Sequence, residues 1–94
     1  MLFHSVKHAS MEDLKGHHSL LMSIRAIRGI QERTPGHFYY RGKSVIHFHT
    51  DNTHIYADIG DRRVIVVEHK YDVITRLLLS YMRSLESHRK GLQT

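Results

Sequence analysis

The sequence contains no cysteine, and it has no long apolar run. Without cysteine the chain has no disulfide framework, no thiolate nucleophile and no zinc site built on sulfur, which fits a reducing compartment. Its longest apolar stretches are too short to cross a bilayer, and residues 1–8 lack the apolar core of a secretion signal. We therefore expect a cytoplasmic protein with no membrane partner.

The common catalytic motifs are missing as well. The sequence has neither the Gly-x-Ser-x-Gly turn of a nucleophilic serine nor a glycine-rich phosphate loop. Its nine acidic residues fall mostly near expected helix starts and turns. The sequence thus favours a non-enzymatic protein, and it predicts no catalytic residue and no organic cofactor.

The 94 residues that are present suffice for one domain with one modest core. Basic residues outnumber acidic ones, which gives a formal net charge of +5, and ten histidines add positive charge as the pH falls. This balance permits an anionic partner. We expect a single domain over residues 1–94, poorly ordered at 1–9 and 91–94.

Two segments have the apolar spacing of amphipathic helices. The first is expected to begin near residue 11, where Ser10 is a suitable N-cap, and to end at Thr34-Pro35-Gly36. The second is expected beyond Lys70 and finishes with cations followed by Gly91. Its apolar stripe consists of Ile74, Leu77, Leu78, Tyr81, Met82 and Leu85.

Between these helices the apolar period changes to that of strands, which predicts four short antiparallel strands. They are expected at 37–40, 44–49, 54–59 and 62–68, joined by turns at Arg41-Gly42-Lys43, Asp51-Asn52 and Gly60-Asp61. The predicted fold class is α+β. It is a four-stranded antiparallel meander with an N-terminal and a C-terminal helix, in the order α-β-β-β-β-α.

The turn lengths also predict which residues face each other. A two-residue turn between the second and third strands places His49 opposite His54. A two-residue turn between the third and fourth strands places Asp58 opposite Arg63. The face expected to receive both helices carries Phe38, Tyr40, Ile46, Phe48, Ile55, Ala57, Ile59, Val64 and Val66. The opposite face is expected to carry His37, Tyr39, Val45, His47, His49, His54, Tyr56, Asp58, Arg63, Ile65 and Val67.

Three histidines form a candidate site for one divalent metal ion. His47 and His49 alternate along one strand and therefore share a face, and His54 across the turn adds a third imidazole. Three such ligands and a water molecule would make an open, catalytic type of site. Its supporting partners would be His37, Tyr56 or Asp58. The alternative is that the histidines are plain surface or interface residues, with Asp58 paired only with Arg63.

Basic residues near two of the turns are candidate contacts for nucleic-acid phosphates. They are Arg41, Lys43, Arg62 and Arg63, with Tyr39 and Tyr56 as candidate stacking platforms. The basic residues are dispersed and acidic residues lie among them. A solvated basic surface is therefore the alternative.

The segment from Arg28 to Lys43, together with His47-Phe48-His49 and Ile55-Tyr56-Ala57-Asp58, carries a resemblance. It resembles small uncharacterised bacterial proteins that are distantly similar to the YjbR (MmcQ-like) family. The shared pattern covers about residues 20–59, where a helix runs into a glycine-and-glutamate turn, a hydrophobic strand and an Arg-Gly-Lys hairpin. The resemblance implies an α+β fold with an antiparallel sheet and a DNA-binding role, and it implies no catalytic residues.

These observations predict a non-enzymatic interaction domain that acts as a homodimer. A second copy is the simplest cover for the sheet face on which polar and apolar side chains are mixed. Two alternatives stay open. One is a DNA- or RNA-binding regulator that uses the basic loops, and the other is a metal-dependent enzyme that uses the sheet histidines.

Overall fold

A computed structural model describes residues 6–92 of the chain, and it describes side chains as far as Ser87. In chain order the elements are β1 (Lys7–His8), the 3-10 turn η1 (Lys15–His17), α1 (His18–Arg25), β2 (Ile30–Thr34), β3 (His37–Tyr40), β4 (Lys43–Thr50), β5 (Ile55–Ile59), β6 (Arg62–Ile65), the 3-10 turn η2 (Glu68–Lys70) and α2 (Tyr71–Leu92). None of the helices in this described part is long and apolar enough to cross a membrane.

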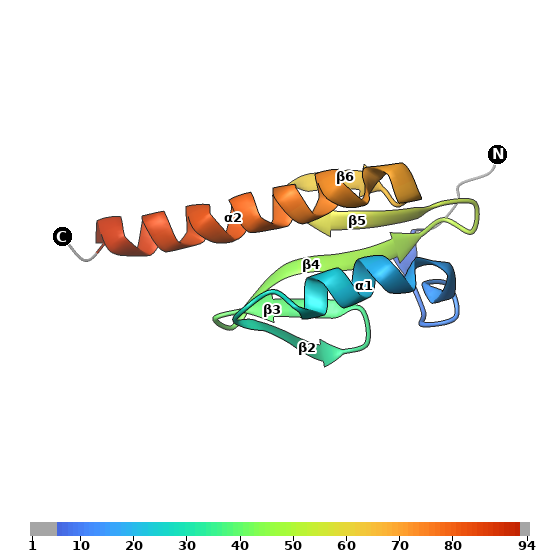
Figure 1. The fold of residues 1–94 in the computed structure, drawn as a ribbon, viewed down its shortest axis with the longest axis horizontal. Helices are drawn as coiled ribbons and strands as arrows, with labels where there is room; N and C mark the ends of the chain where they lie inside the picture. Colours follow the sequence, from blue (N-terminus) through green and yellow to red (C-terminus); the bar gives the residue numbers. More distant parts are fainter. Residues whose placement is uncertain (1–5, 93–94) are drawn as a thin grey trace.

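All strands belong to one antiparallel sheet, in the order β2-β3-β4-β5-β6 (Figure 1). β3 pairs with the beginning of β4, from Lys43 to Ile46. β1 pairs with the end of β4, at His49 and Thr50. Because β5 takes the other edge of β4, β1 and β3 lie end to end along the same edge. The side chains of β1 and β3 are thereby brought together.

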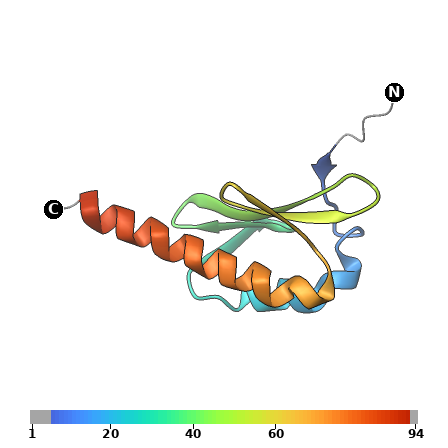
Figure 2. The same ribbon diagram turned by 90° about the horizontal axis from the view of Figure 1, so that it is seen from above.

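Both helices cover one face of the sheet, and α2 projects well beyond it (Figures 1 and 2). The predicted apolar face is confirmed as the core. Its most deeply buried residues are Phe38, Ile46, Phe48, Ala57, Ile59 and, just after β6, Val66, and Tyr40, Ile55 and Val64 pack against them. The helices contribute Leu20, Leu21, Ile24, Ile74, Leu78 and Met82. Burial of these side chains is the main stabilising contribution in a domain of this size.

The α+β class and the antiparallel sheet are confirmed, but the count of four strands and the order α-β-β-β-β-α are wrong. The sheet has six strands, and one of them precedes the first helix. β2 occupies residues that were expected to be helical. α1 ends at Arg25, and residues 26–29 form turns in which Gly29 has a φ of +90°, a left-handed conformation that leads the chain into β2. Pro35 and Gly36 then form the turn of the β2–β3 hairpin instead of a helix stop.

The first helix also starts later than residue 11. Ser10 and Asp13 do form reciprocal bonds: the backbone N–H of Ser10 donates to Asp13 Oδ2 at 2.8 Å, and that of Asp13 donates to Ser10 Oγ at 3.1 Å. These bonds close turns that lead into η1, and regular α-helix begins only at His18. Of the two segments expected to be poorly ordered, 1–9 and 91–94, the first contains β1 (Lys7–His8). Residues 1–5 and 93–94 lie outside the described residues.

The loop between β4 and β5 is longer than predicted. Asp51 Oδ1 accepts hydrogen bonds from the backbone N–H groups of Thr53 at 2.9 Å and His54 at 2.8 Å, which folds residues 51–54 into a compact loop. His49 therefore lies opposite Tyr56, and the predicted pairing of His49 with His54 is wrong. Because the slip is two residues, strand side chains keep their predicted faces.

Two further predictions about strand residues have opposite outcomes. Asp58 lies opposite Arg63 as predicted, because Gly60-Asp61 is a two-residue turn. Val45, however, was expected on the open face and is 1% exposed in the core. The register between β3 and β4 shifts beside it, and this irregularity lets both Val45 and Ile46 point inward.

Two turn glycines provide a matched test of this packing. Gly42 and Gly60 both have positive φ, +81° and +60°, but an added Cβ meets nothing at Gly42 and the ring of Tyr81 at 3.1 Å at Gly60. We expect Gly42→Ala to cost about 1 kcal/mol of backbone strain. Gly60→Ala should lower the free energy of unfolding by at least about 1 kcal/mol more, since the Tyr81 ring on α2 must move aside. Urea unfolding followed by circular dichroism measures both, and equal losses would contradict the Tyr81 contact.

Candidate metal centre on the open sheet face

The sheet face turned away from the helices carries ring-bearing and charged side chains from five strands. We call it the histidine face, and it consists of His8, His37, Tyr39, His47, His49, Tyr56, Asp58 and Arg63. Strand alternation explains its composition, because the residues between these side chains point into the core. In this way Phe48 separates His47 from His49 on β4 and anchors the strand that carries both.

Four imidazole rings from three strands are in contact on this face. The ring centroid of His8 lies 4.7 Å from that of His49 and 4.9 Å from that of His37. The centroids of His47 and His49 are 4.8 Å apart, and those of His37 and His47 are 6.1 Å apart. The end-to-end placement of β1 and β3 beside β4 produces this cluster.

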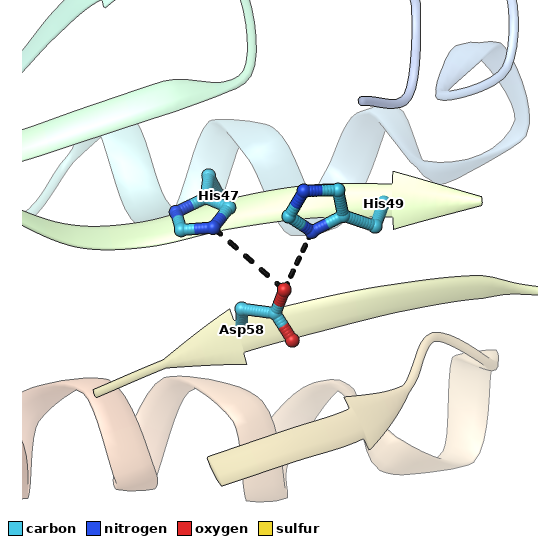
Figure 3. A group of neighbouring side chains, drawn as sticks. All are labelled: His47, His49 and Asp58. Atoms are coloured by element: carbon cyan, nitrogen blue, oxygen red, sulfur yellow. Dashed lines mark hydrogen bonds and ion pairs between the residues drawn. The ribbon is translucent and has the colours of Figure 1, made fainter. Parts of the chain in front are cut away.

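Asp58 lies beside the cluster on β5, where its carboxylate is directed at His47 and His49 (Figure 3), and it is also bound by Arg63. Arg63 donates from Nε to Oδ1 at 2.7 Å and from Nη2 to Oδ2 at 3.0 Å. Oδ2 also lies 2.5 Å from Nδ1 of His49 and 3.7 Å from Nε2 of His47. The side chains of His47, His49 and Asp58 are only 31%, 16% and 14% exposed, so the group is largely shielded from water.

Burial and neighbouring charges shift the protonation of this group. Partial burial lowers the pKa of His47, and the neighbouring His49 lowers it further, although Asp58 acts in the opposite direction. Partial burial likewise lowers the pKa of His37, together with repulsion from His8 and His49. Burial acts to raise the pKa of Asp58, but hydrogen bonds from Arg63 and His49 outweigh it and hold that pKa below its usual range. The lowered pKa values favour neutral imidazole for His37 and His47 and the carboxylate form for Asp58, which are the forms in which these groups bind metals.

Three of these side chains already have the spacing of metal ligands. One ligand atom from each of His47, His49 and Asp58 lies within 4.8 Å of the other two. Two imidazoles and one carboxylate form a donor set that first-row divalent metals accept, including zinc and iron(II). The chain thus provides three protein ligands on rigid strands and leaves further coordination positions free.

The candidate residues named from the sequence separate into two groups in the structure. His47, His49 and Asp58 come together, whereas His54 lies exposed in the β4–β5 loop and is not part of the ligand group. Tyr56 donates its hydroxyl to Asp51 at 3.2 Å and is directed to the rim of the face.

The four predicted phosphate contacts lie at one end of the sheet, near the β3–β4 and β5–β6 turns. Arg41 forms an ion pair with Glu86 of α2 at 2.6 Å, and Arg63 is bound to Asp58. Lys43 and Arg62 are exposed. Only Arg63 of the four therefore borders the metal-ligand group directly.

Sequence reasoning missed the contribution of His8. A two-residue strand gives no alternation to detect, and its pairing with β4 depends on the tertiary fold. It also missed a shallow hollow of about 800 Å³ between the two hairpin tips, lined by Lys43, Ser44, His47, Asp58 and Tyr81 among others. This hollow leads from the exposed end of the sheet to His47 and Asp58.

Comparison of the chain with protein-family models, with curated proteins and with solved structures finds no match. The resemblance to the YjbR family therefore stays a prediction. Arguments about function rest on the geometry of the site itself.

Proposed function

We propose that this protein binds a divalent transition-metal ion through His47, His49 and Asp58. The observation that carries the proposal is the convergence of two imidazoles and one carboxylate on the histidine face, with ligand atoms within 4.8 Å of one another. All three side chains are held by strands, which position ligands more firmly than loops do. The paired strands β4 and β5 fix their separation.

The ligand geometry needs only a small adjustment to take an ion. Metal–ligand bonds of about 2.0–2.1 Å in a tetrahedral site put ligand atoms about 3.3 Å apart. His47 Nε2 lies 3.7 Å from Asp58 Oδ2, close to that value. The 2.5 Å contact between His49 Nδ1 and Asp58 Oδ2 must lengthen as the ion replaces the shared proton. Arg63 can remain on Oδ1, because a carboxylate accepts several partners.

Three protein ligands leave a fourth position for water or substrate. A metal ion lowers the pKa of a bound water molecule, so the site has the composition of a hydrolytic centre. The hollow between the hairpin tips gives solvent and small molecules access to His47 and Asp58. The nearest further imidazole is His8, whose ring centroid is 4.7 Å from that of His49.

Metal binding is tested by titrating untagged protein with zinc and nickel in a calorimeter and by melting it with and without the ion. We expect one ion per chain. At an ion concentration one hundred times the dissociation constant, a ligand specific for the folded state adds about 2.7 kcal/mol of stability. For a domain of this size the melting temperature then rises by about 10–20 °C.

Single-residue variants assign the ligands. His47→Ala, His49→Ala and Asp58→Asn should each weaken binding by tenfold or more, because a tridentate site that loses one donor binds poorly. His54→Ala is the matched control, an exposed histidine five residues from His49 along the chain, and it should bind as tightly as the native protein. If His54→Ala lost the ion, or if His47→Ala and His49→Ala kept it, the assignment would be wrong. Circular dichroism of each variant confirms that it is folded.

A further inference from the structure

We infer that the histidine face binds single-stranded nucleic acid, by base stacking on its rings and by phosphate contacts with the cations around them. This inference does not depend on the metal site. It rests on three observations: six rings on one open sheet face, guanidinium groups that lie over two of those rings, and the positive charge of the chain. Each is a recurring property of surfaces that hold unpaired bases.

The rings extend diagonally across the sheet. Tyr39 on β3 lies opposite Ser44 of β4, and Tyr56 on β5 lies opposite His49 of β4. The two tyrosines are thus five β4 residues apart along the strands, about 17 Å, and two strand spacings apart across them, about 10 Å. The imidazole cluster fills the space between. This length accommodates several consecutive bases, each of which needs a flat surface.

Two guanidinium groups lie over the tyrosines at the ends of this diagonal. The guanidinium carbon of Arg33 is 4.3 Å from the ring centroid of Tyr39, and that of Arg63 is 5.7 Å from the centroid of Tyr56. A guanidinium in this place offers a plane on which a base can stack and a charge for the adjoining phosphate. Exposed Lys43 and Arg62 add charge at the hairpin end of the sheet.

The electrostatics favour an anionic partner over a second copy of the chain. Asp58, the carboxylate of the histidine face, is paired with the Arg63 guanidinium and also hydrogen-bonded to His49. Two copies of a chain with a formal charge of +5 repel each other, whereas a phosphate backbone is attracted. Apart from Ile65, which lies opposite Tyr56, the histidine face presents rings and charges, whereas obligate dimers are stabilised by larger aliphatic surfaces. A single strand fits it better than a duplex does, because duplex bases are stacked internally and cannot reach the rings.

The test measures fluorescence anisotropy of labelled twelve-nucleotide oligothymidine and oligouridine, and of a matched duplex, with EDTA present so that no metal contributes. We expect micromolar binding of the single strands, weaker binding of the duplex, and loss of affinity as salt rises. Tyr39→Ala and Tyr56→Ala should each weaken binding about tenfold, since each removes one stacking surface. Tyr39→Phe and Tyr56→Phe keep the ring and should restore it.

A matched pair of arginine variants separates this surface from general basicity. Arg33→Ala should weaken binding and reduce the salt dependence, whereas Arg76→Ala, on the exposed side of α2, should leave both unchanged.

The inference is overturned if the single strands do not bind at 100 µM protein, if the duplex binds as tightly, or if the tyrosine variants bind like the native chain. It is equally overturned if light scattering shows a dimer that Tyr39→Ala dissociates, because a second copy then covers the face. Metal binding in the calorimeter is unaffected by any of these outcomes.

Discussion

Replacing Phe48 by alanine is expected to lower the free energy of unfolding by about 3–5 kcal/mol, which is a large fraction of the stability of a domain of this size. Phe48 is 1% exposed and lies in the core between sheet and helices. Its removal leaves a cavity that the rigid sheet cannot fully close. Urea unfolding followed by circular dichroism measures the loss, and the melting temperature should fall by about 15–30 °C.

The same substitution should also weaken the metal centre, because Phe48 anchors the strand segment that carries His47 and His49. Met22→Ala is the control: Met22 is 50% exposed on α1, and its truncation should change the free energy of unfolding by less than about 0.5 kcal/mol. A loss of under about 1 kcal/mol in Phe48→Ala would show that this side chain does not hold the sheet against the helices.

Acidification is expected to destabilise the metal-free protein steeply between about pH 7 and pH 5. The pKa values of His37 and His47 lie below the ordinary histidine value, so the unfolded chain takes up protons that the folded chain rejects. Their contribution to stability is fully present above the unfolded value of about 6.5 and is lost as the pH falls through the lower folded values. Each extra proton bound on unfolding lowers the free energy of unfolding by about 1.4 kcal/mol per pH unit.

The groups that face these two imidazoles are His8, His49 and Asp58. The first two add repulsion when protonated, and Asp58 offsets part of it for His47. Urea unfolding in EDTA at half-unit pH steps measures the slope for the native chain and for a His37→Gln, His47→Gln double variant. The double variant should show a shallower slope, whereas His69→Gln, at an exposed position in η2, should not. Equal slopes in all three proteins would show that His37 and His47 are not the source of the acid sensitivity.

The parts of the fold that the sequence predicts are those in which local chemistry and tertiary packing agree. The β5–β6 hairpin is an example, since Gly60 takes the positive φ that a two-residue turn needs and thereby fixes Asp58 opposite Arg63. The stripe of α2 is another, because helical spacing alone places Ile74 and Leu78 in the core. Sorting of strand side chains onto two faces also follows from alternation.

The parts that the sequence does not predict depend on single residues or on distant contacts. Ile30 to Thr34 contain no strand alternation that marks them, and they pair as β2 only after α1 has ended at Arg25 and the left-handed Gly29 has turned the chain. The β4–β5 register depends on the hydrogen bonds that Asp51 accepts from the backbone N–H groups of Thr53 and His54, which the hydrophobic pattern does not predict. For the candidate site, strand alternation predicts that His47 and His49 share a face. The wrong β4–β5 register leads to His54 rather than Asp58 as the third ligand. His8 lies in a two-residue strand that has no pattern to detect.

The place of β1 beside β4 has a practical consequence for anyone who purifies this protein. His8 lies next to imidazoles from β3 and β4, whereas α2 projects away from the sheet (Figure 2). An oligohistidine affinity tag fused on the N-terminal side of β1 would compete with His47 and His49 for added metal ions and would obscure the stoichiometry of binding. An affinity tag placed after α2, or one without histidine, ensures that the measured metal binding comes from the native imidazoles.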